Sequence, residues 1–298
     1  MQVTFIAHAG IAITEGDQEI LIDPWFTDST IDHPLIEPIA GYPTIDFQIP
    51  KTLDVPSAHT PDAVLISHFH SHHAPHDDIM SLVARSAGTK RTLFGHPDIG
   101  ERNVAVSNTF AIWPHVEVTP MRGDDTRVVG ACSVRARTHT VPNHLAWHIE
   151  SAAASVLHIA DPVLNTDNAK RVVDEAWEAF RDLAPSVLFI NAGGNSLRRE
   201  KDGVRTVLES GALSPVEAAK VVALIRPRLV SLIGCYNHSV WRNRQEYIPP
   251  AGQVEEEFAW ALSWLAPEVR FVAAKPGYTY GIGESAGDVL IAVPRHRA

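Results

Sequence analysis

The sequence predicts an α/β protein, a four-layer αββα sandwich in which two β-sheets pack face to face between helical layers. Strand-like segments come in two runs along the chain, and amphipathic helical segments stand between and after them. With 298 residues and 45% hydrophobic composition, the chain can bury a large core without covalent cross-links. Because the composition does not change along the chain, we expect residues 1–298 to form a single domain.

The first run of strands opens the chain. We expect strands at residues 3–7, 11–14, 19–22 and 63–67, each bounded by turn residues. Glu15-Gly16-Asp17 is a hairpin signal between the second and third strands. The segment 24–60 is dense in proline and glycine, and a loop of that length in a compact domain is usually functional. Within it, Trp25 and Phe26 are expected to line a pocket, the alternative being a place in the core.

Four helices are expected from periodicity and capping signals. Residues 77–87 place Ile79, Leu82 and Val83 on one face, and residues 168–183 carry apolar side chains at the same spacing. Ser214-Pro215-Val216-Glu217 is a capping box with proline at the first helical position, and its helix ends near residues 226–227. The last helix is expected at residues 254–265. Helices of this kind should cover the outer faces of the sheets.

The second run of strands follows the first helix. Strands are expected at residues 92–94, 116–119, 128–136, 145–150, 156–160, 187–190, 229–233, 269–272 and 289–293. The segment that follows residue 190 is less regular. Residues 193–195 are a candidate for a phosphate-binding turn. Beyond it, Arg198, Arg199 and Lys201 either contact an anionic substrate or lie in a solvated loop.

The composition limits which binding partners and which cellular compartment we expect. A formal charge of -10 with scattered basic residues argues against nucleic acid as a partner. Cys132 and Cys235 cannot form a disulfide framework, so we expect a reducing, cytoplasmic setting. The N-terminus lacks a signal-peptide pattern, and no run approaches the roughly 18 apolar residues of a membrane span. We therefore expect a small-molecule substrate and no membrane partner, and a homo-oligomer is left open.

Histidines and one aspartate gather where predicted strands end. Five histidines fall within residues 68–76, directly after the strand at 63–67. Imidazole is the commonest neutral metal ligand in proteins, and four strand ends can converge on one rim of the sandwich. The candidates at these strand ends are His68, His70, His72, His73, His139, His144, Asp161 and His238. They outnumber the ligands of one tetrahedral zinc, which points to two metal ions with a shared bridging group.

These residues resemble the signature of the metallo-β-lactamase fold superfamily, HxHxDH followed by a distant His, an Asp and a final His. His68-Phe69-His70-Ser71-His72-His73 matches the first motif except that histidine replaces aspartate at position 72. The opening residues 5–10 and 20–24 are similar to the branch that contains ascorbate-phosphate lactonase, N-acyl phosphatidylethanolamine phospholipase D and the CMP-sialic acid hydroxylase. The resemblance spans residues 3–240 and implies an αββα sandwich of metallo-β-lactamase type.

The resemblance also implies a role for each candidate. His68, His70 and His139 would bind the first metal, since residues 138–144 resemble the family's GHTPGH with one inserted residue, and His144 is the alternative. Asp161 stands where the family has its bridging aspartate. His238 matches the final ligand of the second metal, and His73 with His72 would complete that site.

The histidine at position 72 changes the expected chemistry. A carboxylate there would lend negative charge to the second metal and could accept a proton from an attacking water, whereas imidazole does the first less and the second only when neutral. We expect Asp161 and His72 to take part in catalysis. If His72 points away, the protein works with one ion. A nitrogen-rich site favours two divalent transition metals, Zn²⁺ first, with Fe or Mn as alternatives.

The implied activity is hydrolysis, in which a metal-bound hydroxide attacks an ester, lactone, amide or phosphodiester. No GxSxG elbow or Walker-type loop suggests another nucleophile or phosphate site. The alternative on the same fold is a dinuclear iron oxidoreductase that uses dioxygen, and a third is a scaffold that has lost turnover. His8 and Asp23 also sit at strand ends, where they either hydrogen-bond to a ligand histidine or serve as ordinary turn residues.

Overall fold

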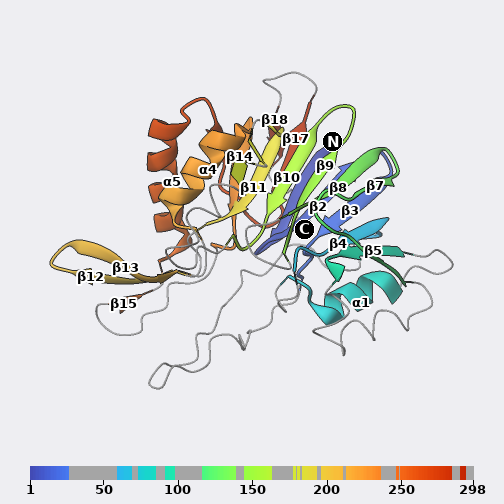
Figure 1. Ribbon diagram of the computed structural model, residues 1–298, viewed down its shortest axis with the longest axis horizontal. Helices are drawn as coiled ribbons and strands as arrows, with labels where there is room; N and C mark the ends of the chain where they lie inside the picture. The colour runs from blue at the N-terminus through green and yellow to red at the C-terminus, as the bar shows by residue number, and fades with distance from the viewer. Residues whose placement is uncertain are drawn as a thin grey trace, which may run out of the picture.

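The computed structural model describes residues 1–26, 59–68, 73–84, 91–97, 116–138, 144–162, 177–178, 180–181, 183–192, 196–210, 213–235, 246–247, 249–283 and 289–292. Two large β-sheets pack face to face, and helices α4 (Pro215–Ile225) and α5 (Ala251–Leu265) cover one of them. Helix α1 (His76–Ala84) covers the other sheet (Figure 1). The predicted four-layer αββα sandwich is confirmed.

The first sheet has the order β18-β17-β1-β2-β3-β4-β5-β6. Its strands are β1 (Gln2–Ala7), β2 (Gly10–Glu15), β3 (Gln18–Ile22), β4 (Ala63–Leu65), β5 (Arg91–Gly95), β6 (Val116–Pro120), β17 (Thr279–Ile282) and β18 (Val289–Ala292). The predicted hairpin joins β2 to β3, with Glu15 paired to Gln18 and Gly16 at a φ of 60°. From β3 to β6 the strands are parallel, so their carboxyl ends share one edge. Strand β17 was not expected from the sequence.

The second sheet has the order β16-β14-β11-β10-β9-β8-β7. Its strands are β7 (Thr126–Val129), β8 (Cys132–Thr138), β9 (Leu145–Glu150), β10 (Ser155–Ile159), β11 (Val187–Asn191), β14 (Leu229–Ile233) and β16 (Arg270–Phe271). The single strand expected at residues 128–136 is wrong, because Val129 pairs with Cys132 across a tight turn. Gly130 makes that turn possible, since its φ of 55° is costly for a residue with a side chain.

A small third sheet was not predicted either. Strands β12 (Ser196–Lys201), β13 (Val204–Ser210) and β15 (Glu246–Tyr247) form it, and the hairpin of β12 and β13 extends away from the body (Figure 1). The solvated loop expected at Arg198 is therefore wrong. Its guanidinium is buried and donates hydrogen bonds of 2.6 and 2.8 Å to the Glu257 carboxylate on α5. Because much of this hairpin is exposed, its sequence lacks the apolar alternation of a half-buried strand.

Helix α4 begins and ends where its local signals place it. Ser214 Oγ accepts a hydrogen bond from the Glu217 amide, and the Glu217 carboxylate accepts one from the Ser214 amide, as the capping box predicts. Helix α4 ends at Arg226 in the left-handed conformation. Most of the helix expected at residues 168–183 lies outside the described residues.

Inward-facing side chains of both sheets form the central core. Val3 and Phe5 from β1 meet Trp147 from β9 and Phe189 from β11 there, all fully buried. Cys132 and Cys235 are buried and form no disulfide, as expected. Among the described residues, no helix has the length and apolar character needed to cross a membrane.

His148 lies on the outer face of β9, opposite Arg135 on β8. It is 8% exposed, and its Nε2 has no hydrogen-bond partner among the described residues. Burial lowers the pKa of His148, and Arg137 and Arg135 act in the same direction against the opposing charge of Glu150. His148 is therefore a neutral, buried imidazole that takes no part in the rim described below.

Replacing His148 with glutamine should make the protein less sensitive to acid. Because the folded-state pKa lies below 6.5, unfolded chains bind this proton first, so the stability that His148 permits above that pH is lost below it. Urea unfolding at about pH 7.5 and about pH 5.5 should show a smaller drop in the midpoint for His148→Gln than for the wild type. An equal drop in both proteins would contradict the assignment.

Candidate metal centre

Strands of both sheets end at a common rim, and the backbone turns sharply there. His8 follows β1, Asp23 follows β3, and Asp161 lies just beyond β10. These three residues have positive φ values of 52°, 45° and 39°. Histidine and aspartate are enriched among the few non-glycine residues found in this region, and such strain gathers at functional sites. The turns let each side chain leave its strand within one or two residues.

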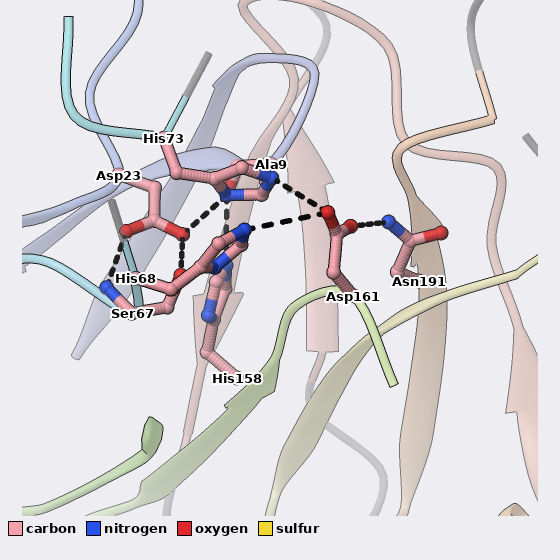
Figure 2. Close-up of polar contacts among 8 residues, drawn as sticks. All are labelled: Ala9, Asp23, Ser67, His68, His73, His158, Asp161 and Asn191. Atoms are coloured by element: carbon pink, nitrogen blue, oxygen red, sulfur yellow. Dashed lines mark hydrogen bonds and ion pairs between the residues drawn. The ribbon is translucent and has the colours of Figure 1, made fainter. Parts of the chain in front are cut away.

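His68, His73 and Asp161 converge at the rim (Figure 2). His68 follows β4 in the first sheet, His73 precedes α1, and Asp161 comes from the second sheet. Each imidazole Nε2 lies 3.4 Å from Asp161 Oδ2, and the three possible ligand atoms lie within 4.8 Å of one another. All three side chains are at least nine-tenths buried. Two imidazole nitrogens and one carboxylate oxygen are a donor set that suits zinc, iron or manganese.

Asp23 fixes the orientation of both imidazole rings. Its Oδ2 accepts hydrogen bonds from His73 Nδ1 at 2.8 Å and from Ser67 Oγ, and its Oδ1 accepts one from the Ser67 amide at 2.7 Å. Because Ser67 Oγ donates its proton to Asp23, it accepts from His68 Nδ1 at 2.9 Å. Both imidazoles therefore carry a proton on Nδ1 and turn Nε2 toward Asp161, which is the arrangement that metal-binding histidines need.

Asn191 holds the carboxylate from the other side. It ends β11, and its Nδ2 donates a hydrogen bond to Asp161 Oδ1, which leaves Oδ2 facing the two histidines (Figure 2). Gly234, just after β14, makes room for this amide. A Cβ at that position would lie 2.3 Å from Asn191 Nδ2 and 2.6 Å from its Cγ, and the φ of Gly234 is +71°.

The pKa values of the two histidines shift in opposite directions. Burial lowers the pKa of His68 well below 6.5, and the positive charge of His73 lowers it further. Burial also lowers the pKa of His73, but Asp161 and Asp23 outweigh it and raise this pKa to about 9. His68 thus offers a lone pair at neutral pH, while His73 would exchange a proton for a metal ion. Uptake of metal should therefore release protons.

Three hydrogen bonds to main-chain carbonyls join the two sheets at the rim. The Leu145 amide, at the start of β9, donates to the Ser67 carbonyl at 2.9 Å, and the Gly234 amide donates to the His8 carbonyl at 2.9 Å. His158 on β10 donates from Nε2 to the Ala9 carbonyl at 2.8 Å, directly beneath the cluster (Figure 2). These bonds fix the distance between residues that belong to different sheets.

The other predicted site residues fall into two groups. His144 stacks on His68 with ring centroids 4.0 Å apart, and His8 meets His73 edge-on at 5.2 Å. Asp23 bonds to His73, as one of the two readings of that residue predicted. The remaining predicted ligands, His70, His72, His139 and His238, lie outside the described residues. So does the candidate phosphate turn at residues 193–195.

Sequence reasoning missed three residues and misplaced two. Ser67, Asn191 and His158 were not proposed, although Ser67 and Asn191 sit at strand ends like the predicted ligands. The pocket expected at Trp25 and Phe26 is wrong for both: they are 2% and 7% exposed and pack with Ile6 and Leu82 in the core beneath α1. Their place in a proline-rich segment gave no signal of this burial.

Comparisons with known proteins agree with this architecture. A family model described as a beta-lactamase superfamily domain matches residues 2–231. Among solved structures, the metallo-beta-lactamase fold protein YhfI from Bacillus subtilis is similar, with a TM-score of 0.59 at 16% identity, covering 93% of this chain and 97% of that one. A search of curated protein sequences gave no match.

Two further structures bear on chemistry. An isothiocyanate hydrolase from Delia radicum gut bacteria matches with a TM-score of 0.60 at 11% identity, covering 95% of this chain and all (100%) of that one. CmlA, a diiron beta-hydroxylase from Streptomyces venezuelae, matches with a TM-score of 0.58 at 14% identity. That match covers 92% of this chain and 53% of CmlA. At these identities the likeness is one of fold.

Replacing Asp23 with asparagine should weaken metal binding about 10- to 100-fold, because partners of metal-binding histidines typically contribute that much. The variant loses the charge that holds His73 Nδ1 and the Ser67 hydroxyl. Titration against a chromogenic chelator measures the affinity. Asp62→Asn is the matched control, since Asp62 also bonds a backbone amide but precedes β4 at the far end of the strand. Equal affinity in both variants would refute the role of Asp23.

Gly234→Ala should disturb Asn191 and, through it, Asp161. Gly203→Ala is the control, because Gly203 has a φ of +75° but no atom within 4 Å of its missing Cβ. Both variants should lose about 1 kcal/mol of stability from backbone strain. Only Gly234→Ala should also lose metal affinity, measured with the same chelator titration. If the two variants bind metal equally well, the contact between Gly234 and Asn191 does not position the carboxylate.

Proposed function

The chain belongs to the beta-lactamase superfamily and has the metallo-β-lactamase fold, and on that premise we propose that it is a metal-dependent hydrolase. One observation carries the proposal: two buried imidazoles from the first sheet's side and a carboxylate from the second turn their possible ligand atoms toward one point. The similar structure of an isothiocyanate hydrolase supports it by analogy.

The chain's own residues would do the following. His68 and His73 would each offer Nε2 to a metal, and Asp161 would offer Oδ2 while Asn191 holds Oδ1. Asp23 keeps both imidazoles in the required orientation. When bound, a divalent transition metal would supply Lewis acidity, lowering the pKa of a water molecule and polarising the bond to be cleaved. The buried setting strengthens these electrostatic effects.

The finer proposal is a pair of metal ions, Zn²⁺ first, acting on an ester, lactone, amide or phosphodiester of a small molecule. In the family's pattern His70 and His139 would complete the first site, and His72 and His238 the second. Two sites sharing Asp161 would account for a carboxylate that lies at the same 3.4 Å distance from both histidines. The substrate class, the likeness to the lactonase and phospholipase branch, and a cytoplasmic setting stay predictions.

A diiron oxidoreductase that uses dioxygen is the second candidate. It is supported by the shared fold of CmlA and by histidine at position 72, which makes the site poorer in carboxylates. The metal separates the two candidates. A coloured protein that contains iron and consumes oxygen with substrate would favour oxidation, whereas a colourless zinc protein would favour hydrolysis.

Protein purified without added metal should hold at least one transition metal ion per chain, by elemental analysis. It should hydrolyse at least one of a nitrophenyl ester, a bis-nitrophenyl phosphodiester and a lactone. Removal of metal with a chelator should abolish that activity and re-addition should restore it. Asp161→Ala and His68→Ala should each lower kcat/KM more than about 100-fold, since even the partners of ligands contribute 10- to 100-fold.

The matched control is His148→Gln, which alters a buried histidine on the same sheet as Asp161 but away from the rim. It should keep both metal content and activity near neutral pH. Clearly less than one metal per chain, or a normal rate in His68→Ala, would overturn the proposal. Oxygen consumption coupled to substrate turnover in an iron-loaded protein would replace hydrolysis with the second candidate.

A further inference from the structure

Helix α5 carries a large apolar surface on its solvent side. Trp260 is 65% exposed and Trp264 is 76% exposed. We call these two residues the tryptophan face. On the opposite side of the helix, Val254, Phe258 and Leu262 pack into the core against the second sheet. The tryptophan face therefore adds nothing to the packing that holds α5 in place.

Tryptophan at these positions contrasts with the other tryptophans among the described residues. Trp25, Trp147 and Trp177 are all 2% exposed or less. A helix buried on one side needs only polar residues on the other, so two tryptophans one turn apart are not a requirement of the fold. Contiguous apolar surface of this kind on a folded chain marks a contact with another surface. Helix α5 lies beside α4 at the outer edge of the molecule (Figure 1), and both of its tryptophan side chains are exposed.

We propose that the tryptophan face is a self-association surface, on which α5 of a second copy docks antiparallel across a two-fold axis. Trp260 and Trp264 are spaced i and i+4, so they lie on one line of the helix. An axis that passes between them brings each tryptophan of one copy against the other tryptophan of the second copy. Such a patch is its own complement, as a two-fold interface requires.

The exposed area agrees with a contact of this kind. At about 250 Å² for a fully exposed tryptophan, the two side chains offer about 350 Å² per chain. A two-fold contact would cover this on both copies, about 700 Å², which is more than half of the roughly 1,200 Å² that small specific interfaces bury. Side chains around the two tryptophans would contribute the rest. Buried tryptophans at the centre of an interface commonly supply most of its binding energy.

The charges on α5 favour a protein partner over a bilayer. The helix contains Glu255, Glu256 and Glu257 and no lysine or arginine, whereas helices that lie on membranes carry basic residues on their polar face. Exposed Glu256 precedes the tryptophan face and exposed Glu268 follows it. An antiparallel pair places the acids of one copy near those of the other. This repulsion lies at the rim and is screened by salt, so the association should tighten as ionic strength rises.

Sedimentation velocity on the full chain at micromolar concentrations tests the proposal. The wild type should sediment as two chains and Trp260→Gln/Trp264→Gln as one, with the dimer weakened more than about 100-fold. Val128→Gln, which changes a residue 77% exposed on β7, is the matched control and should leave the dimer intact. Glu256→Lys should tighten it. Dilution of the wild type should shift its tryptophan fluorescence to longer wavelength, because Trp260 and Trp264 become exposed to water. The double variant should show no such shift.

Three results would overturn the proposal. The wild type could sediment as a monomer at every concentration and salt level tested. It could form oligomers of ever larger size as its concentration rises, which would mean a contact that does not close into a dimer. It could bind phosphatidylcholine vesicles through the two tryptophans, which would assign the face to a bilayer. Far-ultraviolet circular dichroism of the double variant should match the wild type, because both substituted side chains are exposed.

Discussion

The carboxylate of Asp23 is the interaction on which the rest of the candidate site depends. It receives His73 directly and His68 through the Ser67 hydroxyl, so one buried charge sets the orientation of two imidazoles. Without it, each ring could present either nitrogen to the rim, and the two Nε2 atoms would have no reason to face Asp161 together. A single residue at the end of β3 therefore converts two nearby histidines into a pair of donors with fixed direction.

The second constraint is the separation of the two sheets. Asp161 comes from one sheet and His68 from the other, so their distance depends on the core between the sheets as well as on the loops. Main-chain bonds from Leu145 to Ser67 and from Gly234 to His8 join the sheets at the rim itself. Because close-packed cores deform little, the donors are held in position before any ligand arrives, which favours both metal binding and catalysis.

Much of this could be predicted because it follows from local signals. Strand alternation, the capping box at Ser214 and the position of His68 and His73 after β4 all follow from a few neighbouring residues, and the structure places them as expected. The failures have physical causes. Gly130 divides one apolar run into two strands, which periodicity alone does not detect. Arg198 is buried only because Glu257, 59 residues later, pairs with it. Asn191 acts through Asp161, and nothing near it in the sequence indicates that partner.

The charge of the site argues for a division of labour between Asp161 and Asp23. Where the family pattern has aspartate, this chain has histidine at position 72, so the motif itself carries one carboxylate fewer. Asp23 lies behind His73, with its Oδ2 atom 2.8 Å from His73 Nδ1, and draws the proton of that imidazole toward itself. A histidine polarised in this way is a stronger, more negative donor than a free one. With a metal bound at His73 Nε2, part of the charge that a direct carboxylate ligand would supply would reach it through His73. Among the described residues, Asp161 then turns its carboxylate oxygen directly toward the rim, while Asp23 acts from behind His73.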